Sequence, residues 1–423
     1  MSEGADGFRG SMSRHLVDDV LAWWTEHGPD DQYGGVLTCW DNAGRTLRST
    51  DKFTWSQGRW AWLTARVAVA ARAGVLDVDA DHYASLATST AEFVREHALL
   101  EDGSTAFVTD QRGRPRETSP GAGLHTSVFA DLFVALGFAA VSRLGDPVWS
   151  QHAEGLLVSA SERISSGTAR SEPYPVPAGH RSFALPMILV NVAEQVHRAT
   201  ESAISLEILC DAAGQIDCFF RRGADVVEMP AMEAGRDDTL LAWHRTPGHV
   251  LECLWFLEHA ADLLPDAVAP RPWAADAAEH ALALGWDETF GGLFRYTDGH
   301  GGSPTGRRTT DRYEAMVVDT WDTKLWWVHA EALYATALLA RTSGRTALAE
   351  WHERLRAYTA ATFPDGPGRE WTQTRNRDGS PLEATVALPV KDPFHVARSL
   401  LLLVELDHSS DMIAASVPSS EAP

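Results

Sequence analysis

Two histidines stand at the start of strongly apolar stretches of the chain. TPGHVLECLWFLEHA carries His249 and Glu252, and DPFHVARSLLLLVEL carries His395 and Arg398. In each stretch the histidine and the charged residue are three positions apart, which places both on one face of a helix. An imidazole, whose ordinary pKa is roughly 6.5, can accept and donate protons near neutral pH. The repeated pattern predicts that His249 and His395 form a catalytic acid–base pair.

Both histidines are expected in the first turn of a helix, where the positive end of the helix dipole disfavours the imidazolium. We therefore expect neutral rings that accept a proton. Two other interpretations use the same residues. The histidines could be buried and purely structural, or His249, Glu252 and His395 could bind a metal, because His-x-x-Glu is a ligand pattern in helical bundles. No second such motif or Asp cluster supports the metal site, and we expect none.

Two further segments combine cations with tryptophans. FTWSQGRWAW contains Trp55 and Arg59, and WDTKLWWVHAEA contains Lys324 and Trp326. Aromatic faces with a few charges suit the binding of sugars, although Arg59 could also form a salt bridge and the tryptophans could be core residues. His125, which has no partner of this kind in the sequence, is expected to be structural. The predicted substrate-binding residues are Arg59, Glu252, Trp55, Lys324, Trp326 and Arg398.

The elements that hold these residues follow an alternating pattern. Six segments are apolar on every side, as buried helices are, and six amphipathic segments alternate with them, as surface helices do. The buried segments begin at residues 60, 125, 183, 248, 325 and 394, and the amphipathic ones at 13, 82, 147, 202, 272 and 347. Such an internal repeat predicts a solenoid.

Closure of this solenoid would hide every inner helix. We therefore predict an all-α protein, an (α/α)6 barrel, as a single domain over residues 1–408. The alternative, an open superhelix, would need polar capping repeats at both ends. Extended pieces that end in Asn, Asp or Gly turns begin at 33, 104, 290 and 370, and they predict short β-hairpins at one end of the barrel. The small, polar residues 409–423 are predicted to be a disordered tail.

The composition limits the partners. The net charge of −22 over 423 residues argues against binding to nucleic acid or to anionic membranes. No apolar run is long enough for a transmembrane helix. The four cysteines lack zinc-ligand spacing, and the first residues lack the layout of a signal peptide, so we expect a cytoplasmic protein with reduced thiols.

Seven motifs, in order along the chain, make it resemble the N-acylglucosamine 2-epimerase family. They are YGGVLTC, DKFTWSQGRWAW, FALPMILVNVAEQ, TPGHVLECLWFL, GWDETFGGLF, KLWWVHAEA and KDPFHVARSL. The resemblance implies an (α/α)6 barrel that interconverts N-acyl-D-glucosamine and N-acyl-D-mannosamine after the sugar ring opens. It implies that His249 and His395 transfer protons at C2 through an enolate, that Arg59 binds the oxygen at C1, and that Glu252 holds His249 or a sugar hydroxyl.

The resemblance also implies that no cofactor is needed, that ATP is an effector in some members, and that the protein is a homodimer; the chain has no Walker-type glycine loop. Cellobiose 2-epimerases and mannose isomerases usually carry a segment resembling Asn-x-His-x-His on the third inner helix. This chain has FALPMILVN there, as in the N-acylglucosamine type, which favours an acyl-amino sugar as the substrate. The alternative is a mannose isomerase or an epimerase of unmodified sugars. Two features differ from the family pattern. The loop at 297–320 is longer, and VALPVKDPFH lacks the Gly-Cys pair that usually precedes the last motif in the mammalian proteins. A glycoside hydrolase, which needs two catalytic carboxylates, and a non-catalytic sugar-binding module are the other hypotheses.

Overall fold

Six buried helices form a closed ring in the computed structural model, which describes residues 12–386 and 388–416. Each inner helix packs against the next one along the chain, and the last packs back on the first. The inner helices are α3 (Thr54–Arg72), α5 (Val128–Ser142), α7 (Ala184–Thr200), α10 (Pro247–His259), α13 (Trp326–Ser343) and α15 (His395–Ser416). This closure confirms the predicted (α/α)6 barrel, and the alternative prediction of an open superhelix is wrong.

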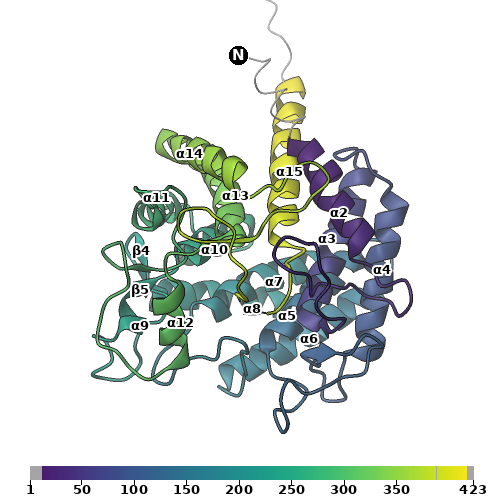
Figure 1. Cartoon of the computed structure of the whole chain (residues 1–423), viewed down its shortest axis with the longest axis horizontal. Helices are drawn as coiled ribbons and strands as arrows, with labels where there is room; N and C mark the ends of the chain where they lie inside the picture. Colours follow the sequence, from purple (N-terminus) through teal and green to yellow (C-terminus); the bar gives the residue numbers. More distant parts are fainter. Residues whose placement is uncertain (1–11, 387, 417–423) are drawn as a thin grey trace, which may run out of the picture.

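An outer helix covers each inner one. α4, α6, α8, α11 and α14 pack on the inner helices that precede them, and η1 packs on α15. Figure 1 shows α4, α11 and α14 at the periphery of the molecule. The outer elements are a π-helical stretch η1 (His15–Leu21) continued by α2 (Ala22–His27), α4 (Ala80–His97), α6 (Val148–Ser165), α8 (Ala203–Gln215) continued by a second π-helical stretch η2 (Ile216–Phe220), α11 (Ala274–Gly285) and α14 (Thr346–Thr362).

Local signals in the sequence set several helix ends. The Asp79 carboxylate caps α4 by accepting hydrogen bonds from the backbone N–H groups of Asp81 and His82. Pro247 occupies the first position of α10, where its missing N–H leaves no helical bond unmade. α13 ends at Ser343, and Gly344 after it takes the left-handed conformation (φ 69°) that a side chain disfavours.

Two glycines allow α3 and α5 to touch through their backbones. A Cβ atom built on Gly58 would lie 2.3 Å from the carbonyl oxygen of Phe133, and one on Gly137 would lie 2.5 Å from the carbonyl oxygen of Gly58. No side chain larger than hydrogen fits at either place. This close approach holds the start of α3, which carries the predicted site residues Trp55 and Arg59, against α5.

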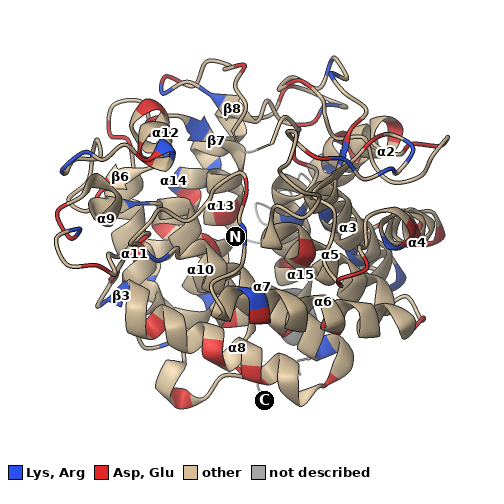
Figure 2. Ribbon diagram, turned by 90° about the horizontal axis from the view of Figure 1, so that it is seen from below, with Lys and Arg blue, Asp and Glu red and all other residues tan. Residues whose placement is uncertain are grey.

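Four two-stranded antiparallel sheets complete the fold, and Figure 2 shows β6, β7 and β8 at the end of the molecule opposite α8. Three of the pairs join the residues just before an inner helix to a segment that follows the next outer helix. These pairs hold the start of the inner helix in place. The pairs are β1 (Lys52–Phe53) with β2 (Val108–Thr109), β3 (Arg221–Arg222) with β4 (Asp225–Val226), β5 (His244–Arg245) with β6 (Thr297–Asp298), and β7 (Lys324–Leu325) with β8 (Thr374–Arg375).

The four predicted hairpins are present at this end of the barrel. Each closes through a tight turn in which a glycine N–H donates to the carbonyl oxygen three residues earlier. These turns run from Asp41 to Gly44, Asp110 to Gly113, Asp298 to Gly301 and Asn376 to Gly379. The Asn, Asp and Gly residues at the turns are the signals from which the hairpins were predicted.

Three short helices were not predicted: α9 (Leu240–Trp243), the 3₁₀ helix η3 (Asp266–Val268) and α12 (Arg312–Thr320). α12 forms within the long loop at 297–320. At the other end of the chain, α15 continues to Ser416, eight residues beyond the predicted domain boundary at 408, and residues 417–423 of the predicted tail lie outside the described part.

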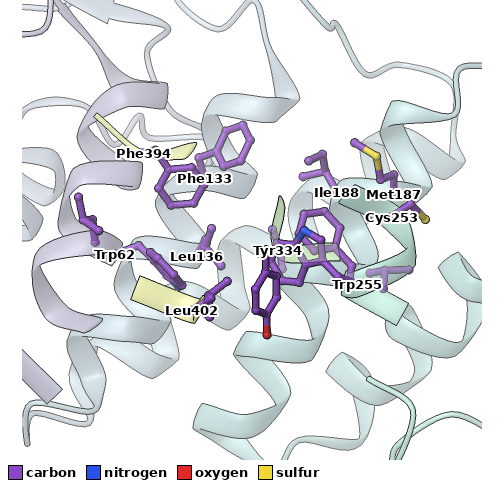
Figure 3. Packing of buried hydrophobic residues seen from close by; sticks show 14 of the residues in the cluster. Trp62, Phe133, Leu136, Met187, Ile188, Cys253, Trp255, Tyr334, Phe394 and Leu402 are labelled. Atoms are coloured by element: carbon purple, nitrogen blue, oxygen red, sulfur yellow. The ribbon is translucent and has the colours of Figure 1, made fainter. Parts of the chain in front are cut away.

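Large apolar side chains from the inner helices fill the middle of the barrel. Figure 3 shows Trp62, Leu136, Trp255, Tyr334 and Leu402 converging between the helices that carry them. These side chains pack the middle of the barrel, and a cavity lies where the first turns of the inner helices meet.

Candidate active site

A cavity of about 140 Å³ lies where all six inner helices begin. Each helix contributes residues from its first or second turn: Trp55 and Arg59 from α3, Phe129 and Phe133 from α5, Met187 and Ile188 from α7, His249 and Glu252 from α10, Trp326 and Trp327 from α13, and His395 from α15. Six positive helix ends therefore point toward one space, which favours negative charge there.

His249 is held by a buried carboxylate outside its own helix. Its Nδ1 lies 3.0 and 3.2 Å from the two oxygens of Glu228, and its side chain keeps 22% exposure. A carboxylate only accepts hydrogen bonds, so Nδ1 carries the proton. Nε2 is then the nitrogen that can exchange a proton with a molecule in the cavity.

His395 is held in the same way. Its Nδ1 donates to Oε1 of Glu331 at 2.8 Å, and its side chain is 8% exposed. The ring of Trp327 contacts both histidines, with its centroid 5.2 Å from that of His249 and 6.0 Å from that of His395. Two imidazoles with the same tautomer thus border one cavity and share contact with one tryptophan.

The pKa of His249 differs from the sequence-based expectation. Burial alone lowers this pKa, but the attraction and hydrogen bond of Glu228, together with the charge of Glu252, outweigh burial and raise it above its ordinary value. Glu228, which the sequence did not reveal, thus acts against the lowering effect that the helix dipole was expected to have on the pKa of His249. His249 holds its proton to higher pH than an isolated histidine does.

Asp392 joins three parts of the cavity wall. Its Oδ1 accepts a hydrogen bond from Arg59 at 3.3 Å, and its Oδ2 accepts from the indole of Trp326 at 3.1 Å and from the backbone N–H of His395 at 2.9 Å. Burial lowers the pKa of Arg59 to about 10, against the opposing charge of Asp392, so the guanidinium stays protonated at neutral pH. One carboxylate thus positions the cation, an aromatic wall and the start of α15.

Three aromatic rings enclose Arg59 as well. Its guanidinium carbon lies 4.9 Å from the ring centroid of Trp55, 4.0 Å from that of Phe133 and 5.1 Å from that of Phe394. Contacts of this kind hold a guanidinium in place while leaving N–H groups for a ligand. Trp55, Arg59 and Trp326 accordingly border the cavity as predicted from the sequence.

Arg398 bridges the carboxylates behind His395. Its Nη2 donates to Glu252 at 2.5 Å and to Glu331 at 2.7 Å. Glu252, Glu331 and His395 offer ligand atoms within 4.8 Å of one another. The guanidinium already supplies the positive charge that these carboxylates need, and His249 is not part of this group. The arrangement does not favour the metal site considered from the sequence.

The structure corrects the placement of two predicted substrate-binding residues. Lys324 is fully buried, with its Nζ 3.1 Å from Asp287 and 3.3 Å from the carbonyl oxygen of Gly292, and it does not border the cavity. Strand β7 turns its side chain toward this buried ion pair. Arg398, at 2% exposure, lies behind His395 and positions it rather than facing a ligand.

Four residues at or behind the cavity wall were not predicted from the sequence. Glu228 lies in an irregular segment with no pattern to mark it. Asp392 stands three residues before His395, where an Asp commonly caps a helix, so that signal was available. Arg295 interrupts the apolar run LFRY, and Glu331 stands in WDTKLWWVHAEA with no pattern that links it to His395.

A larger cavity of about 470 Å³ adjoins the first. The two share Trp55, Arg59, Trp326 and Val386, and the larger one also contacts residues of the 383–392 segment. Arg48 and Glu383, both well exposed, form an ion pair of 3.3 Å beside it. This arrangement places an antechamber next to the cavity that holds the histidines.

Comparison with known proteins identifies a family. The model of the family described as N-acylglucosamine 2-epimerase (GlcNAc 2-epimerase) matches residues 35–399. The N-acylglucosamine 2-epimerase of Bos taurus is 29% identical over 422 residues, covering 96% of this chain and 93% of its own. The Homo sapiens protein of the same name is 27% identical over 407 residues, covering 92% and 88%.

Solved structures share the fold. A sugar epimerase from a ruminal bacterium has a TM-score of 0.75 at 16% identity, covering 94% of this chain and 99% of its own. A D-mannose isomerase has a TM-score of 0.71 at 17% identity, covering 95% and 97%. At such low identity these likenesses concern the barrel alone.

Proposed function

We propose that this chain, which belongs to the N-acylglucosamine 2-epimerase family, interconverts N-acyl-D-glucosamine and N-acyl-D-mannosamine. The observation that carries the proposal is the pair of histidines, each fixed at Nδ1 by a buried carboxylate and both bordering one cavity. No cofactor takes part in the proposed reaction.

The reaction begins when the sugar ring opens and leaves an aldehyde at C1, which makes the proton on C2 acidic. One histidine removes that proton through Nε2, and an enolate forms. The other histidine then returns a proton to C2 from the opposite face, which inverts the configuration. In the reverse direction the two histidines exchange roles, as reversibility requires.

The charges around the cavity suit this path. Arg59, which stays protonated, is proposed to bind the oxygen at C1, where negative charge develops. The convergent helix starts add positive potential in a space largely enclosed by apolar side chains. Glu228 and Glu331 would stabilise each imidazolium as it forms and keep each ring in one orientation.

Incubation with N-acetylmannosamine in deuterated water tests the proposal. The product N-acetylglucosamine should carry deuterium at C2, as read by NMR, because the returned proton comes from a histidine that exchanges with solvent. Product that keeps its original C2 proton would overturn the proton-transfer mechanism. A ketose product would instead identify an aldose–ketose isomerase.

Assembly and location stay predictions. Family resemblance predicts a homodimer, which light scattering of the purified protein measures directly. The cytoplasmic location predicted from the sequence can be tested by cell fractionation. No helix among the described residues is long and apolar enough to cross a membrane.

A further inference from the structure

Arg295 is a buried cation of the cavity wall that lacks an anionic partner. It is 4% exposed and borders the cavity beside His249. Its N–H groups donate to Thr320 at 3.0 Å, to the hydroxyl of Tyr174 at 3.3 Å and to the sulfur of Met316 at 3.5 Å. All three acceptors are neutral, and no carboxylate of the described residues forms an ion pair with Arg295.

The other buried cations show how unusual this is. Among the residues that the structure describes, five of them bind a carboxylate directly, and the sixth, Arg375, donates to two backbone carbonyls and lies away from the cavity. The paired ones are Lys52 with Asp30, Arg245 with Asp225, Lys324 with Asp287, Lys391 with Glu370, and Arg398 with Glu252 and Glu331. A buried charge without a partner is costly, so Arg295 is expected to meet an electron-rich group of a ligand.

The long loop at 297–320 holds Arg295 in place. Met316 and Thr320, two of its three acceptors, belong to α12, the helix that forms within this loop. The third acceptor, Tyr174, donates its own hydroxyl to the carbonyl oxygen of Val386 at 2.7 Å. The guanidinium is thus anchored from two sides while it borders the cavity.

The position beside His249 limits which part of a sugar Arg295 can meet. His249 must approach C2, so neighbouring groups lie close to the substituents of C1, C2 and C3. Arg59 is tied through Asp392 to the His395 part of the cavity wall. Of the groups left for Arg295, the carbonyl oxygen of an N-acyl group on C2 is the strongest hydrogen-bond acceptor.

We propose that Arg295 binds the carbonyl oxygen of the N-acyl group, so that it selects acylated amino sugars over sugars with a hydroxyl at C2. The inference rests on the proposed function and names the residue that determines which class of sugar the enzyme accepts. Met187 and Ile188, apolar residues of the α7 part of the same cavity, provide a surface for the acyl methyl group. Arg295 acts in substrate binding and transfers no proton.

Binding of two sugar alcohols tests this without any need for turnover. N-acetylglucosaminitol and glucitol mimic the ring-opened sugar with and without the acyl group, and neither has the acidic C2 proton. Tryptophan fluorescence should show that the wild-type protein binds N-acetylglucosaminitol more tightly. In Arg295→Met this affinity should fall roughly 10- to 100-fold, as for loss of a hydrogen bond to a charged group, while that for glucitol changes less than about threefold. Arg295→Lys should keep part of the preference.

Arg375→Met is the matched control, because it removes a buried arginine that also lacks a carboxylate but does not border the cavity. It should keep the acyl preference. The inference is overturned if the wild-type protein shows no preference, or if Arg295→Met keeps it while its thermal unfolding stays normal. An intact acyl preference without C2 exchange would instead overturn the proposed function alone.

Discussion

At the scale of single residues, both histidines follow one design. Each imidazole stands at the start of an inner helix and binds a buried carboxylate through Nδ1. The carboxylates come from elsewhere in the chain, Glu228 from a loop and Glu331 from α13. The fold therefore supplies the tautomer and orientation that the histidine motif alone does not specify.

The carboxylate of Glu228 should set the pH dependence of activity. Because it raises the pKa of His249 against the opposing effect of burial, Glu228→Gln should lower that pKa. In the direction where His249 is the base, kcat/KM rises with pH as the ring loses its proton. The midpoint of that rise should move to lower pH by about one pH unit or more.

A carboxylate on the same helix provides the control for this measurement. Glu258 is buried near the other end of α10 and lies 3.4 Å from Arg271. Glu258→Gln should leave the midpoint of the pH profile in place. A midpoint that stays unchanged, or rises, in Glu228→Gln would show that Glu228 does not control His249.

Part of the site could be predicted at this scale. His249, His395, Arg59 and Trp55 stand at helix starts that apolar periodicity reveals, and they share one cavity in the structure. Glu228 could not be found in this way, because it belongs to no periodic segment and meets His249 only through the tertiary fold. Lys324 was misplaced because periodicity does not tell which way a strand residue points.

At the scale of elements, the starts of the inner helices carry the chemistry, and a side-chain cap fixes the start of α15. Asp392 accepts the N–H of His395 and so fixes the first turn of α15. The helices themselves were predictable from their all-round apolar character, whereas α12 was not, since RYEAMVVDT is short and lies in a polar loop.

Two substitutions of Asp392 should separate its roles. Asp392→Asn can still accept from the His395 N–H but loses the charge that pairs with Arg59, and Asp392→Ala loses both. Asp392→Ala should therefore be about 1–2 kcal/mol less stable than Asp392→Asn, the usual value of a helix cap, and both should turn over more slowly. Urea unfolding measures the difference, and equal stabilities would show that the cap contributes nothing.

The backbone contact between α3 and α5 leads to a separate prediction. Gly58→Ala forces a methyl group to within 2.3 Å of the Phe133 carbonyl oxygen, so we expect a loss of about 3 kcal/mol or more, at the upper end for overpacking. Gly155, on the outer helix α6, has no atom within 4 Å of such a methyl group.

Gly155→Ala should therefore stabilise the protein by roughly 0.5–1 kcal/mol, the usual gain in helix propensity. Urea unfolding of both variants provides the comparison. A Gly58→Ala protein as stable as Gly155→Ala would mean that α3 and α5 do not touch as described.

At the scale of the whole molecule, ring closure makes the first and last inner helices neighbours. The guanidinium of Arg66 on α3 lies 2.8 and 2.7 Å from the two oxygens of Glu405 on α15. Alternation of buried and amphipathic segments was enough to predict this closed barrel. The position of the antechamber was not predictable, because loops far apart in the sequence form it.

If the closed ring is one domain, it should unfold as one. Every inner helix depends on two neighbours, so loss of any contact exposes core on both sides. Circular dichroism at far-ultraviolet wavelengths and tryptophan fluorescence should report the same midpoint in urea. Two separated midpoints would show that part of the barrel is stable alone and would contradict a single-domain barrel.

The central claim is that two histidines serve opposite faces of C2, and hydrogen exchange in the single variants His249→Asn and His395→Asn tests it most directly. Epimerisation should fall about a hundredfold or more in each. With one histidine left, each variant can still remove and return a proton on one face. In deuterated water each should therefore exchange the C2 proton of one epimer only, N-acetylglucosamine in one variant and N-acetylmannosamine in the other. Exchange of both epimers by the same variant would contradict the two-histidine account.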